Sequence, residues 1–539
     1  MRFVSVRRAV PLGIATAAAL ALGAPGVASA KKVTPPNPDV LEQCSGAQKI
    51  ESEGSTFQAP AMFLWTGVNS EKSNEELHVG FNFSSSPLAC AGLSGQGSLE
   101  KPVVYDNQTG SANRGSGSCL KTWGNGIKSF GEVKSGETYP RVKKFPLCGT
   151  DEAPTKAVKE EFEGKEFMAE GGEAGKGEAI ESIPVAQGAV AVIVHLPKNC
   201  LATSEITTSK GKVLKLGRLA LDQEVVEEIY RGTIKTWAQA MTKEGSDGHD
   251  TLTCKESAEN DTIRPVVRAD KSGTTHIFKE FLAQVYTGKW AAEEFKEVNG
   301  GEKPCTSGEL GAGASVTWAQ VGEGCENQRW PEAAHILRPV ETGNPGVINE
   351  VNNTESSIGY ADLAVAQEKG FFSKKNVGGE NKKGEQHTEF WAPVQNSEPG
   401  TTPVTFADPS SKEDKEKEGD SNCKDTKYVS AKGEEFPPLS TRYDWSKVKG
   451  EDVSKTYPIC GLTYILAARQ YYYFLSKYGV SEAESQKIAT TVHDFLVWAV
   501  NTGTGGGGKL LKNSDYEALP KTVQAEAEFG AEEVGSKVA

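Results

Sequence analysis

The chain has 539 residues, of which 24% are charged, and its formal net charge is −13 at pH 7. A surface of that sign repels nucleic acid and anionic lipid, so neither is expected as a partner. Because the overall field also opposes an anionic ligand, such a ligand would need local dipoles and a specific cation. The length indicates two or more domains.

The first 30 residues have the pattern of a cleavable export signal. Three arginines lie among the first eight residues, an Ala/Leu-rich core follows, and small residues occupy positions 28–30. No later stretch reaches the roughly 20 apolar residues that a membrane-spanning helix needs. Lys31 stands where a lipid-modified cysteine would lie, so no lipid anchor is expected. We predict an exported protein of the periplasm, the cell envelope or the extracellular medium.

All ten cysteines follow this segment. Their even number in an exported chain predicts disulfide bonds, whose pairing the sequence leaves open, although Cys305 with Cys325 would close a local loop. None forms a Cys-x-x-Cys pair or neighbours a histidine at zinc spacing, so no metal site is expected. The ten are Cys44, Cys90, Cys119, Cys148, Cys200, Cys254, Cys305, Cys325, Cys423 and Cys460.

Apolar, β-rich runs alternate with amphipathic helical stretches along the chain. This alternation predicts α/β lobes with largely parallel sheets. Residues 190–195 are expected to form a buried strand, and a helix should start with Asp222 as its N-cap and end at Gly232. A further strand is predicted at residues 263–268 and a further helix at 274–285.

Three polar stretches interrupt the alternation, at residues 163–181, 299–324 and 371–453. The last contains the mixed-charge run 412–420. Such compositions are typical of solvated loops. We therefore predict that these stretches are surface insertions.

Four segments place small polar residues where a strand gives way to a helix, at residues 54–60, 105–123, 145–154 and 266–275. Free backbone N–H groups and the positive end of a helix dipole gather at such points and attract an anion. Taken alone, each of the first three is also explained by an ordinary helix cap or a flexible loop.

The fourth segment is the most informative. Arg268 leaves the strand end, and Asp270 can pin its guanidinium two residues later. Ser272, Gly273 and Thr274 then open the next helix with hydroxyls and free amides. The planar, permanently charged guanidinium of Arg268 suits a tetrahedral oxyanion. A turn held only by a salt bridge between Arg268 and Asp270 would have the same sequence pattern.

Together the four segments resemble the phosphate-binding subunit of the bacterial high-affinity phosphate ABC transporter, in the type II periplasmic solute-binding protein superfamily. Supporting matches follow in the same order along the chain, at residues 183–190, 229–237, 343–347, 357–360 and 515–520. The resemblance implies an α/β fold of two lobes, joined by two hinge crossings, with a ligand cleft between them. It also implies binding of inorganic phosphate, delivery to a membrane permease, a monomeric state and no cofactor.

The family's binding residues can be carried over one by one. The resemblance places phosphate ligands at Thr56, Phe57, Ser116, Asp151, Arg268, Ser272, Gly273 and Thr274, with Asp270 in support. Gln58 stands where the family usually has proline, and Ser118 and Cys119 replace a small pair. The proline after the Thr-Asp turn comes one residue late, so Glu152 is a rival to Asp151 for the acidic role.

The predicted organisation is a signal peptide at residues 1–30, a first part of lobe 1 at 31–190, lobe 2 with its polar insertions at 191–460, and a return to lobe 1 with a C-terminal tail at 461–539. The strand 190–195 and the segment 457–466 would be the two crossings.

No catalytic chemistry is expected. A phosphatase would need an activated nucleophile or a metal cluster, and the seven histidines are scattered, with only His276 near the proposed site. The glycine-rich run 503–509 has the spacing of a phosphate loop, but Leu510 replaces the residue that would hold Mg²⁺. A secreted phosphate sensor or adhesin on the same fold remains the alternative to transport.

Overall fold

The structure is a computed structural model, and it describes the following residues: 47–67, 81, 103–105, 115–123, 145–163, 180–244, 250–297, 315–322, 327–371, 388–398, 401–411, 420–430, 444–451, 456–476, 479–512 and 514–535. The predicted signal peptide and most of the mixed-charge run lie outside these residues, as do Cys44, Cys90, Cys305 and Cys325. Within the described ranges, no helix is long and apolar enough to cross a membrane.

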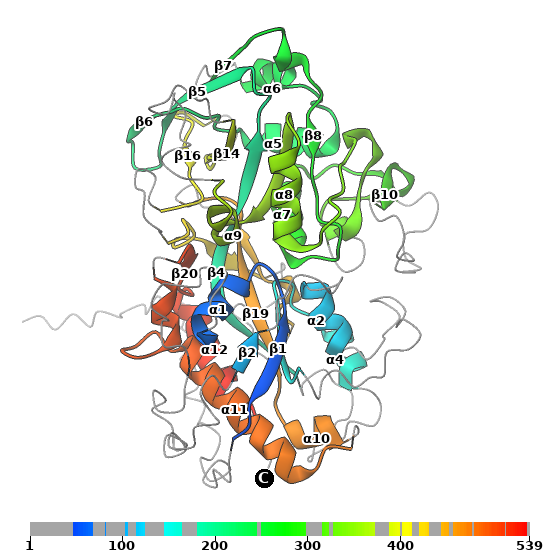
Figure 1. Cartoon of the computed structure of the whole chain (residues 1–539), viewed down its shortest axis with the longest axis vertical. Helices are drawn as coiled ribbons and strands as arrows, with labels where there is room; N and C mark the ends of the chain where they lie inside the picture. Colours follow the sequence, from blue (N-terminus) through cyan, green and yellow to red (C-terminus); the bar gives the residue numbers. More distant parts are fainter. Residues whose placement is uncertain are drawn as a thin grey trace, which may run out of the picture.

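Two long strands join an upper and a lower half of the molecule (Figure 1). Strand β4 (Ile180–His195) has 16 residues, every one of them buried. Its first part pairs with β19 (Cys460–Ala468), from Ala189 opposite Cys460 to Ile180 opposite Ala468. Its second part pairs with strands of the other half. The chain thus passes between the halves along a shared pair of antiparallel strands.

The lower half is built on one side of these strands, in the sheet order β2-β1-β3-β19-β4. Strand β1 runs parallel to β2 and β3, and β19 runs antiparallel to β3. The other strands here are β1 (Ile50–Gly54), β2 (Val103–Tyr105), β3 (Leu147–Thr150) and β20 (Tyr516–Glu517). The helices are α1 (Ala59–Thr66), α2 (Ser116–Trp123), α4 (Lys156–Glu163), α10 (Tyr471–Ser476), α11 (Glu482–Val500) and α12 (Lys521–Glu533).

The upper half continues β4 with two antiparallel neighbours, β13 and β14, and β8 runs parallel to β13. The strands of this sheet are β8 (Arg264–Pro265), β13 (Ser357–Asp362) and β14 (Glu389–Ala392). Its helices are α5 (Gln223–Arg231), α6 (Trp237–Glu244), α7 (Gly273–Val285), α8 (Gly343–Asn353) and α9 (Leu363–Glu368). A three-stranded sheet of β5 (Cys200–Thr207), β6 (Val213–Leu216) and β7 (Asp250–Cys254) lies at the far end (Figure 1).

Short two-stranded sheets complete the structure. They pair β9 (Trp290–Ala291) with β11 (Ser315–Val316), β10 (Phe295–Glu297) with β12 (Arg329–Pro331), β15 (Val394–Gln395) with β16 (Phe406–Ala407), and β17 (Lys427–Val429) with β18 (Lys449–Glu451).

The two predicted helices are confirmed as α5 and α7. Asp222 is the N-cap of α5, and Gly232 ends that helix with a φ of 84°, a left-handed conformation that glycine adopts at little cost. The predicted strand at 263–268 is shorter than expected, because only Arg264 and Pro265 pair as a ladder. The expectation of largely parallel sheets was wrong at the centre, since two passes of the chain in opposite directions place β4 and β19 antiparallel.

The stretch 371–453 is not simply a polar insertion, since it supplies β14 to β18. Strand β14 adds directly to β4, and Trp391, Tyr428 and Trp445 are buried. A disulfide from Cys423 to Cys460 fastens the stretch to β19. The prediction failed here because a few well-spaced aromatic residues bury substantial area even within a polar average composition.

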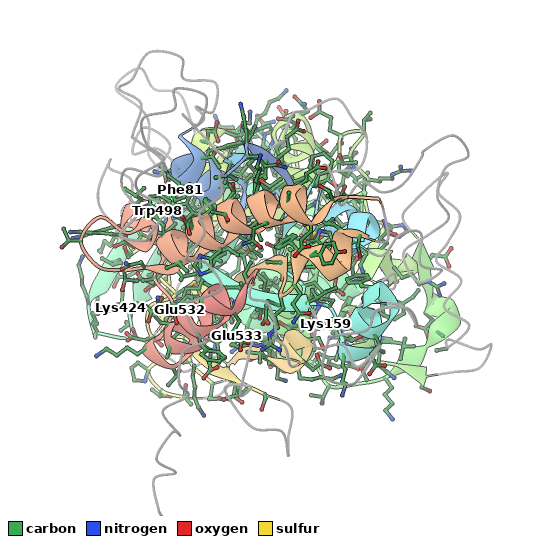
Figure 2. All side chains as sticks on the ribbon, turned by 90° about the horizontal axis from the view of Figure 1, so that it is seen from below. Phe81, Lys159, Lys424, Trp498, Glu532 and Glu533 are labelled. Atoms are coloured by element: carbon green, nitrogen blue, oxygen red, sulfur yellow. A yellow bond between two sulfur atoms is a disulfide. The ribbon has the colours of Figure 1, made fainter. Side chains whose placement is uncertain are left out.

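Aromatic packing fills the base of the lower half. Phe81 lies beside Trp498 of α11, as Figure 2 shows, with ring centroids 5.5 Å apart. Phe495 of the same helix meets Phe81 edge to face at 5.6 Å. Trp65 of α1 donates its ring N–H to the carbonyl of Gly507 at 2.9 Å. These contacts connect the base of the lower half to α1 through Trp65 and to α11 through Phe495 and Trp498.

Disulfides among the described residues confirm the oxidised state expected for the cysteines. Besides Cys423–Cys460, they join Cys119 to Cys148 and Cys200 to Cys254. The Cys119–Cys148 bond ties α2, which begins with Ser116, to β3, which Asp151 directly follows.

Candidate anion-binding site

Four helices begin close together where the two halves meet. The segment containing Thr56 leads into α1, and Ser116, Gly273 and Gly343 are the first residues of α2, α7 and α8. The backbone N–H of Asn344 in the upper half donates to Thr56 Oγ1 in the lower half at 3.2 Å. Since the N-terminus of a helix carries partial positive charge and unpaired N–H groups, such a meeting point favours an anion.

Asp151 lies at this junction, directly after β3. Its Oδ2 accepts hydrogen bonds from Ser55 at 2.5 Å and Ser116 at 3.2 Å, and its Oδ1 accepts one from Thr463 at 2.8 Å. Burial raises the pKa of the carboxyl from 3.8 to about 6, against the lowering effects of the Ser55 and Thr463 hydrogen bonds, the charge of Arg268 and the Ser116 hydrogen bond. At neutral pH it is a buried carboxylate that can only accept hydrogen bonds.

Arg268 faces Asp151 from the other half, and only 2% of its surface is exposed. Its Nε and Nη2 donate to the two carboxylate oxygens of Asp270 at 2.9 and 2.5 Å, and its Nη1 donates to Thr274 Oγ1 at 3.3 Å. Asp270 also accepts the backbone N–H of Gly343 at 3.1 Å. The carboxylate therefore orients the guanidinium and ties it to the start of α8.

Two glycines allow the halves to approach closely. A Cβ atom at Gly273 would lie 2.6 Å from Asp151 Cβ and 2.7 Å from Ser116 Oγ. A Cβ atom at Gly115 would lie 2.7 Å from Asp270 Oδ2. All three distances are shorter than real Cβ atoms show, so a larger residue at either position would require groups of the other half to move.

The structure brings most of the predicted site residues together at the junction, through hydrogen bonds within each half and close contacts between the halves: Thr56, Ser116, Asp151, Arg268, Asp270, Gly273 and Thr274. Phe57 and Ser272 bond within their own halves instead. The Phe57 N–H donates to Ser55 Oγ at 2.9 Å, and its ring packs edge to face on Tyr516. Ser272 Oγ caps α7 by accepting the N–H of Thr275 at 3.2 Å.

Glu152, the rival acid, lies differently. Its Oε1 is 3.8 Å from Lys271 Nζ. The hydroxyls of Ser55, Ser116 and Thr463 bond to Asp151.

Sequence reasoning missed Ser55, Thr463, Asn344 and Tyr360. Ser55 directly precedes Thr56, and Asn344 and Tyr360 lie in two of the supporting matches, so closer attention to those segments could have found three of them. The Tyr360 hydroxyl accepts the N–H of Arg268 at 3.3 Å and holds the strand end in place. Thr463 is an ordinary residue within a buried strand, and no local pattern marks it.

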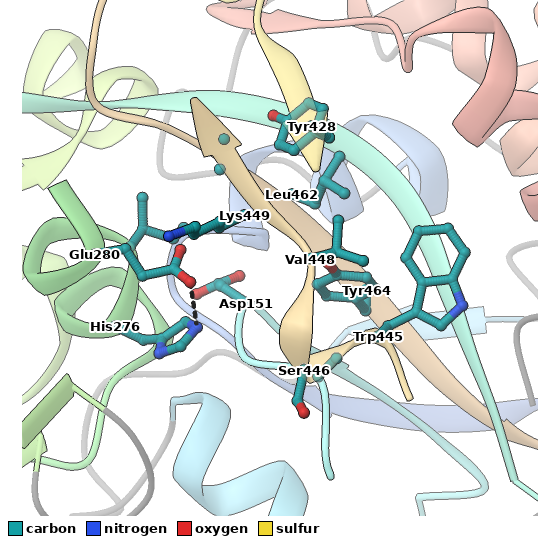
Figure 3. A pocket seen from close by; sticks show the side chains of 14 residues that line it. Asp151, His276, Glu280, Tyr428, Trp445, Ser446, Val448, Lys449, Leu462 and Tyr464 are labelled. Carbon is teal, nitrogen blue, oxygen red and sulfur yellow. Dashed lines mark ion pairs between the residues drawn. The ribbon is translucent and has the colours of Figure 1, made fainter. Parts of the chain in front are cut away.

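A recess opens beside Asp151 (Figure 3). His276 and Glu280 of α7 line one side of the recess, where the side chain of Lys449 lies near Glu280, and Trp445 lies on the other side. His276 Nε2 lies 3.5 Å from Glu280 Oε1, and its Nδ1 lies 3.1 Å from the carbonyl oxygen of Gly322. In the part of the chain that the structure describes, no group of three or more His, Cys, Asp or Glu side chains could hold a metal ion.

A family model described as the PBP superfamily domain matches residues 150–501, which is more than half of the chain. The chain belongs to the PBP superfamily. The two halves that share β4 are accordingly the lobes of a PBP superfamily fold.

Individual members of the superfamily are distant in sequence. Phosphate-binding protein PstS of Pasteurella multocida is 24% identical over 350 residues, which cover 63% of this chain and 67% of that protein. Phosphate-binding protein PstS of Methanocaldococcus jannaschii is 26% identical over 187 residues, covering 34% of this chain and 35% of that protein. A phosphate-binding protein structure from Stenotrophomonas maltophilia aligns with a TM-score of 0.45 at 14% identity, over 89% of this chain and 93% of that one.

Proposed function

We propose that this chain binds inorganic phosphate in the cleft between its lobes and delivers it to the permease of an ABC transporter. The observation that carries the proposal is the meeting of four helix N-termini around the Arg268–Asp270 pair and the buried Asp151. Two relatives named as phosphate-binding proteins support it. The proposed phosphate ligands are Thr56, Phe57, Ser116, Asp151, Arg268, Ser272, Gly273 and Thr274, with Asp270 in support.

The chemistry of these groups fits a protonated oxyanion. Arg268 supplies a charged fork, and the helix N-termini supply neutral N–H and hydroxyl donors for the oxygens that carry negative charge. The carboxylate of Asp151 needs a donor in return, and H₂PO₄⁻ and HPO₄²⁻ each bring a hydroxyl. Fully ionised sulfate brings none.

Closure of the lobes follows from the same geometry. The proposed ligands come from both lobes, which we place at residues 31–190 with 461–539 and at 191–460. A ligand that receives hydrogen bonds from both lobes binds the closed form more tightly and shifts the population toward it. Gly273 lies against Asp151 and Ser116 in this structure, so entry of phosphate requires the lobes to separate.

Binding without chemical conversion completes the proposal. His276, the histidine nearest to the site, is engaged with Glu280 and Gly322 rather than with a nucleophile. We propose a monomer that is exported to the periplasm or cell envelope, where its disulfides form.

Isothermal titration and thermal unfolding of phosphate-stripped protein test the function. Phosphate should bind with measurable heat and raise the melting temperature, because a ligand at 100 times its Kd adds about 2.7 kcal/mol to stability. Sulfate at the same concentration is the matched control and should do neither. Absence of both heat and melting shift with phosphate would reject the function.

A further inference from the structure

Asn344 is a buried residue at the centre of the junction that none of the predicted ligand sets contains. It is the second residue of α8, and its side chain has no exposed surface. Its backbone N–H donates to Thr56 Oγ1 at 3.2 Å, and its Nδ2 donates to Thr274 Oγ1 at 3.4 Å. Thr274 Oγ1 is in turn 3.3 Å from Arg268 Nη1. Asn344 therefore directly contacts two proposed ligands and lies one hydrogen bond from a third.

The side-chain oxygen of Asn344 is buried beside Thr56 and Thr274, two of the proposed ligands. Among the residues that the structure describes, no donor bonds to its Oδ1, although the atom is buried. Leaving a buried acceptor without a donor is unfavourable, and native proteins do so rarely. Because Asn344 contacts Thr56 and Thr274, a ligand held by those two residues can supply the missing donor.

We propose that Asn344 Oδ1 accepts a hydrogen bond from bound phosphate and thereby makes the site prefer H₂PO₄⁻ to HPO₄²⁻. This inference rests on the proposed function. Asp151 and Asn344 Oδ1 are both acceptors, so together they require two hydroxyl groups on the ligand. The monobasic anion has two, whereas the dibasic anion has one and would turn a charged oxygen toward one of the two acceptors.

The pH dependence of affinity provides the test. Titrations should be run from pH 6.5 to 8.5, a range that lies above the pKa of about 6 of Asp151 in the free protein. Across it the monobasic fraction falls, so the affinity of the wild type for total phosphate should fall about tenfold or more. Asn344→Ala removes the acceptor, and its affinity should change no more than about twofold over the same range. Asn344→Asp keeps an acceptor and should retain the fall.

A matched control is available on the same helix. Asn349 bonds Glu341 near the surface at 2.7 Å, and Asn349→Ala should follow the wild-type pH profile. Unfolding of each ligand-free variant checks that the comparison concerns folded protein, and the wild-type profile tests the inference even if one variant does not fold.

Two results would overturn the inference while leaving phosphate binding intact. If the affinity of Asn344→Ala fell with pH in parallel with that of the wild type, and were lower by the same factor at every pH, the amide would only support Thr274. A wild-type affinity that rises with pH would show that the site prefers the dibasic anion, so Asn344 Oδ1 would not select H₂PO₄⁻. Absence of phosphate binding at every pH would instead reject the proposed function itself.

Discussion

The two sides of the junction balance charge in different ways. On the lobe 2 side, Arg268 is paired through two hydrogen bonds with its own neighbour Asp270. On the lobe 1 side, Asp151 is held by three neutral hydroxyls. The hydrogen bonds from Ser55 and Thr463 each lower the pKa of Asp151 more than the charge of Arg268 does. In the proposed site, this difference makes Arg268 the group expected to orient and attract the anion without a large excess of charge, and Asp151 the acceptor expected to select among anions.

Removing the cation should give the largest effect. Arg268→Ala should weaken phosphate binding roughly 10³-fold, because it removes the fork and leaves Asp270 as an uncompensated, mostly buried charge beside the ligand. Titration calorimetry measures the change. An affinity close to that of the wild type would place Arg268 outside the site.

A double variant separates the two contributions of the pair. Arg268→Ala combined with Asp270→Asn removes the stranded charge and should recover part of the lost affinity. If the double variant binds no better than Arg268→Ala, then repulsion from Asp270 contributes nothing to the loss.

Changing the acceptor should alter selectivity more than affinity. Asp151→Asn replaces a pure acceptor with a group that can also donate, so phosphate should weaken only a fewfold while sulfate binding improves roughly 10²-fold. Competition of the two anions on wild type and variant at neutral pH is the measurement. If the wild type already binds sulfate comparably, Asp151 does not face the ligand.

The pH dependence of folding stability should show the free-energy cost of ionising the buried Asp151. Burial raises the pKa of Asp151 in the folded protein from 3.8 to about 6. The protonated carboxyl therefore contributes to folding stability below pH 4, and this contribution is lost as the pH rises through 6. The total loss in the free energy of unfolding is on the order of 3 kcal/mol. Ligand-free Asp151→Asn should therefore gain stability relative to wild type between pH 4.5 and 7.5. Denaturant unfolding at the two pH values checks this, and a constant difference would contradict it.

The sequence predicted the parts of the site that lie on contiguous segments. Arg268, Asp270 and the start of α7 stand together because one strand-to-helix turn places them there, and spacing along the chain suffices to see it. Thr463 reaches Asp151 from 312 positions away, through the register of β19 on β3. That pairing is set by burial of whole strands, which no local pattern encodes.

The insertion at 371–453 also shows that local sequence does not reveal long-range packing. Its average composition predicts a solvated loop, but the Tyr428 hydroxyl bonds Gln187 of β4 at 3.0 Å, and Trp445 packs on Tyr464 of β19. Composition averages over residues, whereas burial depends on the few aromatic side chains that find a partner surface. Tyr428 and Trp445 of the insertion therefore belong to the core beside β4 and β19.

Shortening the insertion should give the smallest effect if the cut respects these contacts. The flanks are held together, because Ser411 N–H donates to the Asp420 carbonyl at 2.9 Å and Asn422 N–H donates to the Pro409 carbonyl at 2.8 Å. Replacing residues 412–419 with Asn-Gly, which favours a tight two-residue turn, should leave phosphate affinity within about twofold of wild type. A cut extended through Cys423 would instead remove the disulfide to Cys460.

Trp445→Ala is the contrasting variant within the same predicted insertion. Trp445 is fully buried, so its truncation should cost about 3 to 5 kcal/mol of stability. Calorimetric titration and denaturant unfolding of both variants measure the contrast. If the 412–419 replacement abolishes phosphate binding while the protein stays folded, the mixed-charge run contributes to the cleft and the proposed ligand set is incomplete. If Trp445→Ala unfolds like wild type, the insertion is a surface loop after all, because a side chain that anchors a core cannot be removed without loss.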